Sequence, residues 1–205
     1  MNLYYNNNDK TPKHKTFLSF HHKDEGYRDR FEQEYSEDRG DYVSRSVKDG
    51  DIDPTWPTER IRQKIRDEFI SDATVTLVLI SPDTWKRKHV DWEISSSIRD
   101  TKNNPRNGLL GILLPNYQYT MDGCSYADIK RTESGRLYNP FTIPPRLFEN
   151  VQCGYAKIYS WPATYNDVKK WIHDAYLGKE IKNPSNAYPL FSKNRNDDQR
   201  YWQKE

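Results

Sequence analysis

The sequence predicts an α/β protein with three layers, in which helices cover both faces of a doubly wound, parallel sheet of about five strands. Two observations predict this class. Apolar runs of strand length alternate along the chain with segments that repeat their apolar residues at helical spacing. Two of the runs, 74–80 (TVTLVLI) and 108–114 (GLLGILL), lack the polar and apolar alternation of a half-exposed strand. They are therefore expected to be central strands, and right-handed connections between successive strands make the sheet parallel.

Length and composition indicate one medium-sized domain with extensions. The 205 residues are 34% hydrophobic and 30% charged, which predicts a modest core and a polar surface. A net charge of +2 argues against a nucleic-acid binder that relies on bulk electrostatics. The two cysteines, Cys124 and Cys153, favour a reducing compartment over a disulfide scaffold. The N-terminus has no apolar stretch typical of a signal peptide and no apolar run reaches membrane-spanning length, so we expect a cytoplasmic protein.

The first half of the chain supplies three of the expected strands and two helices. Residues 1–15 are rich in Asn and Lys, and we expect a flexible arm there. Thr58 is predicted to cap the second helix, whose apolar stripe is Ile61, Ile65 and Phe69. The predicted elements, in chain order, are a strand at 16–20, a helix at 27–34, a strand at 42–47, a loop at 49–57, the helix after Thr58 and a strand at 74–80.

The second half begins with a helix at 88–98 (KHVDWEISSSI) that is expected to end near 103–105. Val90, Ile94 and Ile98 form its apolar stripe. The further elements are strands at 108–114 and 155–159, a helix at 165–177, and an insert at 115–154 that is rich in Tyr, Pro and Gly and is predicted to be irregular. The main domain thus covers 16–177, and the extension at 178–205 is expected to be anchored by Tyr188, Leu190, Phe191 and Trp202.

Glu93 is the main chemical candidate in the helix at 88–98. It lies at the flank of the apolar stripe, where a carboxylate can reach a crevice beside the sheet, and Ser96 and Ser97 leave room near it. Position alone fits a solvated or ion-paired glutamate as well, which is the more frequent state of this residue type. Ligands of parallel sheets bind beyond the carboxyl ends of the strands, which are here 20–22, 46–48, 81–83 and 114–116.

Motifs of several other site classes are missing or incomplete. The sequence has no GxGxxG, GxxxxGK[ST] or GxSxG motif, which argues against a dinucleotide cofactor cradle, a P-loop and a nucleophile elbow. His21 and His22 are adjacent but have no second His or Cys cluster close to them in sequence, so no metal site is expected. The acidic turn at 49–53 lacks the rest of a calcium loop. The cluster at 85–88 (WKRK) fits either a contact for a diphosphate or an ordinary basic surface.

Three segments in this order resemble a TIR domain: TFLSFHHKD at 16–24, TVTLVLIS at 74–81 and HVDWEI at 89–94. The closest likeness is to the TIR-like (ThsB-like) proteins of the bacterial Thoeris anti-phage system, and it covers about residues 16–114. The first-strand motif is common by chance, but its combination with HVDWEI after the third strand is much less so. The resemblance implies a flavodoxin-like TIR fold and an enzyme that hydrolyses or cyclises NAD, with NAD as substrate and without a cofactor or metal.

The resemblance also implies site residues. The catalytic glutamate of the family matches Glu93. Many relatives carry an acid after the second strand, where this chain has the serines of 44–46. The tryptophan that begins the family's catalytic helix is replaced by His89, and Trp92 stands next to the glutamate instead. The substrate-binding candidates are therefore Phe20, His21, His22, Ser44, Ser46 and Trp92.

By the same resemblance, the expected role is that of an infection sensor. Infection triggers cleavage of NAD at the nicotinamide–ribose bond and release of a cyclic or conjugated ADP-ribose messenger, which activates a separate effector. The expected partners are NAD, a phage-derived trigger and further copies of the chain, without nucleic acid or membrane. The insert at 115–153 is the candidate lid over the site.

The residue types fit this chemistry without reference to a family. NAD loses nicotinamide through an oxocarbenium-like state, as in glycoside cleavage, and its leaving group is already cationic, so that no general acid is required. A carboxylate in a poorly hydrated crevice stabilises the developing positive charge, and Glu93 is the candidate. Phe20 or a nearby tryptophan can stack on an aromatic base.

Two other functions stay open at the level of sequence. The first is a non-catalytic TIR interaction or sensor module, which would release no nicotinamide from NAD. The second is a phospho-receiver of flavodoxin-like fold, which needs an acidic pair for Mg²⁺ after the first strand. Lys23, Asp24 and Glu25 are a poor substitute for that pair.

Overall fold

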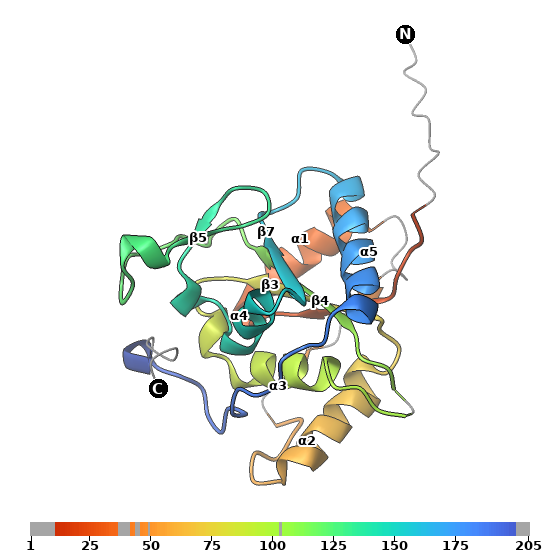
Figure 1. Ribbon diagram of the computed structural model, residues 1–205. Coiled ribbons are helices and arrows are strands. Elements are labelled where there is room, and N and C mark those ends of the chain that lie inside the picture. The colour runs from red at the N-terminus through yellow and green to blue at the C-terminus, as the bar shows by residue number, and fades with distance from the viewer. Residues whose placement is uncertain (1–10, 37–41, 44–45, 49, 103, 200–205) are drawn as a thin grey trace.

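Five parallel strands form the central sheet in the order β2-β1-β3-β4-β7 (Figure 1). The computed structural model describes residues 11–36, 42–43, 46–48, 50–102 and 104–199. The strands are β1 (Thr16–Ser19), β2 (Tyr42–Val43), β3 (Val75–Ile80), β4 (Gly108–Leu113) and β7 (Ala156–Tyr159). The strand order reverses between β1 and β3, and this confirms the predicted doubly wound fold.

Helices cover both faces of this sheet (Figure 1). The helices are α1 (Glu25–Tyr35), α2 (Thr58–Ile65), α3 (Lys88–Ser97), α4 (Pro145–Gln152) and α5 (Tyr165–Ile181). One face packs against α1 and α5, and the other packs against α3 and α4, with α2 beyond α3. The alternation of side chains along β3 supplies both cores, because Leu77 and Leu79 point to the first face and Val78 and Ile80 to the second.

The apolar run of β3 and that of β4 lie side by side in the middle of the sheet. The register pairs Val75 with Gly108 through Ile80 with Leu113, and every residue of both strands is buried. Gly108 permits the closest approach of a helix, because a Cβ atom at this position would lie 2.3 Å from the backbone oxygen of Ala175 in α5. The continuous apolar character of the two runs therefore follows from burial on both faces.

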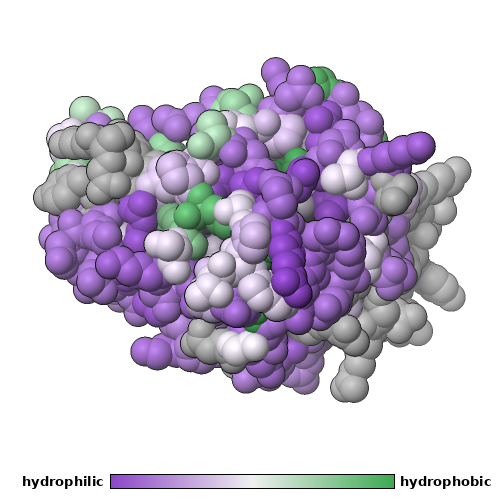
Figure 2. Space-filling model, turned by 90° about the horizontal axis from the view of Figure 1, so that it is seen from below, coloured by the Kyte–Doolittle hydropathy of each residue, from purple (hydrophilic) through white to green (hydrophobic). Residues whose placement is uncertain are grey.

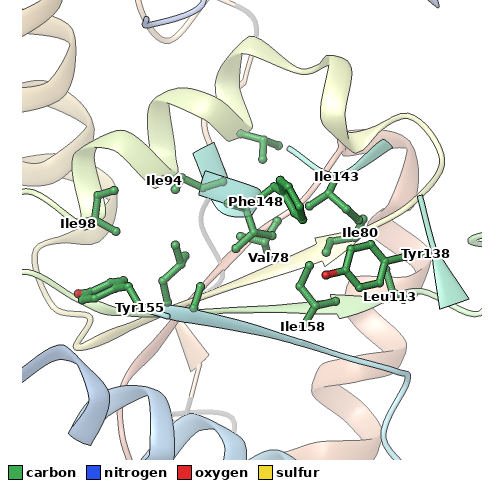
Figure 3. Packing of buried hydrophobic residues seen from close by; sticks show 14 of the residues in the cluster. Val78, Ile80, Ile94, Ile98, Leu113, Tyr138, Ile143, Phe148, Tyr155 and Ile158 are labelled. Carbon is green, nitrogen blue, oxygen red and sulfur yellow. The ribbon is translucent and has the colours of Figure 1, made fainter. Parts of the chain in front are cut away.

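The core between the sheet and α3 contains the predicted stripe of that helix (Figure 3). Val90, Ile94 and Ile98 are all at most 2% exposed. The helix ends earlier than predicted, at Ser97, and the chain then turns back so that the amide of Asn107 donates to the carbonyl of Ser97. The predicted end near 103–105 was wrong because the polar residues after the stripe form this turn.

Two details of α2 differ from the prediction. Pro57 occupies the N-cap position and Thr58 is the first helical residue, so that the predicted cap at Thr58 is wrong by one position. A π-helical turn at Arg66–Ile70 then adds a residue to the helical repeat. Ile70 therefore enters the core, while Phe69, the third residue of the predicted stripe, is only partly buried.

The insert at 115–154 is more regular than predicted. It contains the short hairpin of β5 (Lys130–Arg131) and β6 (Leu137–Tyr138), and it ends in α4. Proline is favourable at the first position of a helix, and α4 begins at Pro145 after Pro144. Leu147 and Phe148 of α4 are buried in the core on the sheet. The prediction of an irregular insert was wrong because this pair of prolines begins a helix.

The segment that follows α5 runs back along α3 and α4 (Figure 1). Phe191, one of its predicted anchors, is buried, and Tyr188 and Leu190 are partly buried. Trp202 lies outside the described residues. We call residues 185–197 the strap because their hydrogen bonds join α3 to α4.

The face that carries α2 is mostly hydrophilic, with small apolar patches (Figure 2). Among the described helices, none combines the length and the apolar character that crossing a bilayer requires. The two cysteines, Cys124 and Cys153, are both free thiols.

Candidate active site

A cavity of about 340 Å³ lies at the carboxyl end of β1, beside the point where the strand order reverses. Its wall comes from five parts of the chain: the exit of β1, the first residue of α1, the segment 46–48, the start of α3, and the strap. The lining residues are Phe20, His21, His22, Glu25, Ser46, Val47, Lys48, Arg87, His89, Val90 and Asn194. The cavity is therefore placed where parallel sheets bind ligands.

Glu93 lies directly behind this wall. Its side chain is buried, with 1% of the residue exposed. Ser19 Oγ donates to Oε2 at 2.6 Å, and the amide of Val47 donates to Oε1, also at 2.6 Å. Because Val47 also lines the cavity, the backbone of 46–48 separates the carboxyl group from the open space.

Two elements bring this carboxyl group to the edge of the sheet. On α3, Val90 lies in the cavity wall and Glu93 follows one turn later on the same side. On β1, Ser19 ends the strand and pairs in register with Val78, so its hydroxyl stands at the carboxyl edge. A small side chain is required there, since Ser19 is fully buried and the carboxyl group fills the space in front of it.

Burial determines the charge of Glu93. Loss of hydration raises the pKa of its carboxyl group to about 8, although the hydrogen bonds from Ser19 and Val47 act in the opposite direction. No ion pair of this carboxyl group occurs among the described residues. In the structure Glu93 is therefore mainly protonated at neutral pH.

The histidines after β1 form one side of the cavity. His21 is buried, and its pKa is lowered to about 4 by burial, by Arg87 and by His22. It is thus a neutral imidazole near pH 7. His22 is exposed, and the rings of His21 and His22 meet edge to face with their centroids 4.5 Å apart.

The basic cluster at 85–88 contributes one residue to the cavity wall. Trp85 is buried, and Lys86 is ion-paired with Asp83 at 2.6 Å and with Asp197 at 2.7 Å. Arg87 lines the cavity, and its Nε donates to the carbonyl of Asp83 at 3.3 Å. Of the four residues, Arg87 is therefore the one that is placed to meet an anionic ligand in the cavity.

The structure brings most of the predicted substrate-binding residues to the cavity. Phe20, His21, His22 and Ser46 all line it. Ser44 lies outside the described residues. The cavity-lining residues all come from outside the insert at 115–154, so the predicted lid has no contact with this space in the described part of the chain.

Trp92 is placed elsewhere. Its ring is buried with apolar residues of α2 and β1, and its Nε1 donates to the carbonyl of Phe191 at 2.7 Å. Trp92 is not among the lining residues of the cavity, whose contributions from α3 are His89 and Val90. The interpretation of Trp92 as a substrate contact is therefore corrected: it anchors the strap.

Three members of the site were missed in the sequence. Ser19 was included in the first strand without a role, although a small polar residue at the end of a parallel strand can indicate a place in a site. The amide of Val47 has no side-chain signature at all. Asn194 enters from a segment about a hundred residues after α3, and only the tertiary structure reveals it.

A comparison with family models finds one match. The model described as "Thoeris protein ThsB, TIR-like domain" matches residues 17–132, which is more than half of the chain. The match includes β1 from Phe17 onward, the cavity residues up to Val90, and α3 with Glu93, and it ends before α4. No curated protein matches the chain.

Proposed function

The chain belongs to the TIR-like family of the Thoeris protein ThsB, which places it in anti-phage defence, and from this premise we propose that it is an enzyme that cleaves NAD. The bond broken is the one between nicotinamide and ribose, and the product is a signalling nucleotide derived from ADP-ribose. The proposal is carried by one observation: a buried glutamate carboxyl group stands behind a cavity at the carboxyl edge of a parallel sheet.

The cavity offers groups that match the parts of a dinucleotide. Its size is in the range of small-molecule sites. Phe20 presents an aromatic ring for stacking on a base, and Arg87 and Lys48 present positive charge for a diphosphate. Neutral His21 supplies a hydrogen-bonding group for ribose hydroxyls.

Glu93 is proposed to stabilise the ribosyl cation as nicotinamide departs. For this its carboxyl group must be exposed to the cavity, so the segment 46–48 moves and the hydrogen bond from Val47 is broken. The positive charge of the nicotinamide ring then favours the ionised form of Glu93, which burial disfavours in the closed structure. On this proposal, the closed position of 46–48 keeps turnover low until a trigger acts.

A messenger is formed when water is excluded from the ribosyl cation. A hydroxyl group or ring nitrogen of the same molecule, or of a second molecule, then captures the cation in place of water. The chemistry of capture depends on which acceptor the closed cavity holds beside the ribose.

The experiment that tests this function compares wild type with Glu93→Gln. Each protein is incubated with NAD, with and without lysate of phage-infected cells, and nicotinamide release is measured by chromatography. We expect loss of release in Glu93→Gln because a neutral amide cannot stabilise the cation. Glu68→Gln, on the exposed side of the π-helical turn, is the matched control and should behave as wild type. Undiminished release in Glu93→Gln rejects the assignment.

The covered position of Glu93 also favours a second function. The carboxyl group of Glu93 is protonated and separated from the cavity, which also fits a non-catalytic TIR module that acts by binding. Absence of nicotinamide release from wild type, both with and without the lysate, supports the module.

A further inference from the structure

We propose that the strap is part of the candidate active site, in which Asn194 is a positioning residue that holds the first turn of α3 and closes one wall of the cavity. The inference rests on the proposed function only where it takes the cavity as the NAD site. The family match ends at residue 132, so the strap lies outside the matched segment.

The strap holds α3 along a side of the helix that differs from its apolar stripe. Its contacts recur at every turn of the helix, at Lys88, Asp91, Trp92 and Ser95. Asn194 Oδ1 accepts from the amide of Lys88 at 3.0 Å. This spacing of three and four residues defines one face of a helix, and it is distinct from the apolar stripe that packs on the sheet.

The middle of the strap is bound by backbone groups. The amide of Phe191 donates to Asp91 Oδ2 at 3.0 Å, and the carbonyl of Phe191 accepts from Trp92 Nε1 at 2.7 Å. One residue of the strap is thereby bonded in both directions to consecutive residues of α3. Such a pair of bonds fixes both the rotation of the helix about its axis and its position along that axis.

A buried ion pair supports this contact from α4. Arg146 Nε donates to Asp91 Oδ1 at 2.9 Å, and both side chains are almost fully buried. Arg146 Nη1 also donates to Asn186 Oδ1 at 2.6 Å, and Asn186 Nδ2 donates to the carbonyl of Ser95 at 3.0 Å. The strap, α3 and α4 are therefore joined by one hydrogen-bonded network.

Asn194 has two roles in this arrangement. The N-cap residue of α3 is Arg87, whose side chain makes no capping hydrogen bond, and Asn194 supplies the missing acceptor from a distant part of the chain. Asn194 also lines the cavity together with Arg87 and Lys48. Its Nδ2 group is a hydrogen-bond donor on a wall that carries positive charge. Next to it, the amide of Arg195 donates to the carbonyl of Lys86 at 2.8 Å.

The position of α3 determines whether Glu93 can act. Its carboxyl group is held at 2.6 Å from both Ser19 and Val47, and a small rotation of the helix would break these contacts. Because the apolar stripe alone permits sliding and rotation, the polar contacts of the strap supply the directional part of the positioning.

The experiment compares Asn194→Ala and Asn194→Asp with Ser192→Ala, an exposed neighbour in the strap, as the matched control. Amide hydrogen exchange at the start of α3 reports the positioning, and NAD turnover reports KM and kcat. Asn194→Ala removes the acceptor, and we expect exchange at Lys88 to become about fivefold faster, the factor that corresponds to loss of a typical helix cap. We also expect kcat to fall, while the control stays as wild type.

Asn194→Asp separates the two roles. It keeps an oxygen acceptor for the amide of Lys88, so exchange stays slow. Its negative charge opposes a diphosphate in the cavity, so we expect KM to rise about tenfold with kcat little changed. A residue with a purely structural role would not produce this split.

Unchanged exchange at Lys88 in Asn194→Ala overturns the inference, whether or not wild type cleaves NAD. Equal KM values for wild type and Asn194→Asp overturn the assignment of Asn194 to the substrate wall. Failure of the proposed function itself is recognised separately, because wild type then releases no nicotinamide while the exchange comparison still reads the positioning role.

Discussion

Burial keeps the carboxyl group of Glu93 neutral, and no neighbouring charge contributes to the raised pKa. Its two hydrogen-bond donors, Ser19 Oγ and the amide of Val47, satisfy the oxygens in the closed structure. On the proposed mechanism the group ionises when its surroundings open, and its raised pKa is measurable in two independent ways.

The first measurement is the pH dependence of NAD turnover. The value of kcat/KM reports the ionisation of the free enzyme, and the proposed mechanism requires ionised Glu93. Since its pKa is raised to about 8, we expect kcat/KM to rise with pH and to level off above about that value. His21, whose pKa is lowered to about 4, contributes nothing in this range. A profile that is flat between about pH 6 and 9 contradicts the role of Glu93.

The second measurement is the free energy of unfolding of Glu93→Gln relative to wild type. The folded pKa of Glu93, about 8, exceeds its ordinary value of 4.5, so the folded state binds this proton more tightly than the unfolded state does. Below pH 4.5 both states are protonated and the difference between the proteins is independent of pH. Above it, wild type loses stability relative to Glu93→Gln by about 1.4 kcal/mol per pH unit, up to the folded pKa. Denaturant unfolding at several pH values measures the effect, and parallel curves for the two proteins refute it.

At the same scale, the sequence predicted the position of the Glu93 side chain correctly and that of the Trp92 side chain wrongly. The stripe of Val90, Ile94 and Ile98 fixes which side of α3 faces the sheet, and Glu93 follows from that stripe. Trp92 was assigned to the pocket by its nearness in sequence, but its partner is the carbonyl of Phe191. A contact between residues 99 positions apart leaves no periodic pattern in the chain, and the same reason hid Asn194.

At the scale of the elements, the close packing of α5 against β4 can be tested by a single substitution. Gly108→Ala places a Cβ atom 2.3 Å from the backbone oxygen of Ala175, and a backbone atom cannot rotate away. We expect a loss of about 1–3 kcal/mol in the free energy of unfolding, or more, because α5 must shift.

Gly178→Ala is the matched control for this substitution. A Cβ atom at Gly178, within α5, meets nothing within 4 Å. Alanine is the better helix former, so we expect a gain of up to about 1 kcal/mol from the same chemical change. Thermal and denaturant unfolding measure whether each variant is less or more stable than wild type. A free energy of unfolding that is unchanged in Gly108→Ala contradicts the close packing.

Strands were easier to predict than the elements of the insert. The runs at 74–80 and 108–114 are apolar throughout because β3 and β4 are buried on both faces, and this signal is local. The helix α4 begins at a pair of prolines, which in isolation indicate a loop. The apolar face of α4 consists of few residues, and two of the elements that it packs against, α3 and β4, are distant in sequence.

On the scale of the whole molecule, the ion pair of Asp91 and Arg146 connects α3, α4 and the strap. Arg146→Met leaves a buried carboxylate without its cation, and we expect the free energy of unfolding to fall by about 3–5 kcal/mol. The exposed pair of Lys170 and Asp174 on α5 is the control, since Lys170→Met should cost less than about 1 kcal/mol. Equal effects of the two substitutions in denaturant unfolding would show that the buried network does not hold these parts together.

The placement of Glu93 behind Val47 has a consequence for the cell that carries this protein. NAD is shared by all of metabolism, so an enzyme that consumes it is dangerous to its host whenever it fires without cause. With a pKa of about 8, only about one molecule in ten is deprotonated at pH 7 even before the backbone barrier is counted. On the proposed function, the closed position of 46–48 therefore suppresses the leak in uninfected cells, because it covers the carboxyl group and thereby keeps it protonated.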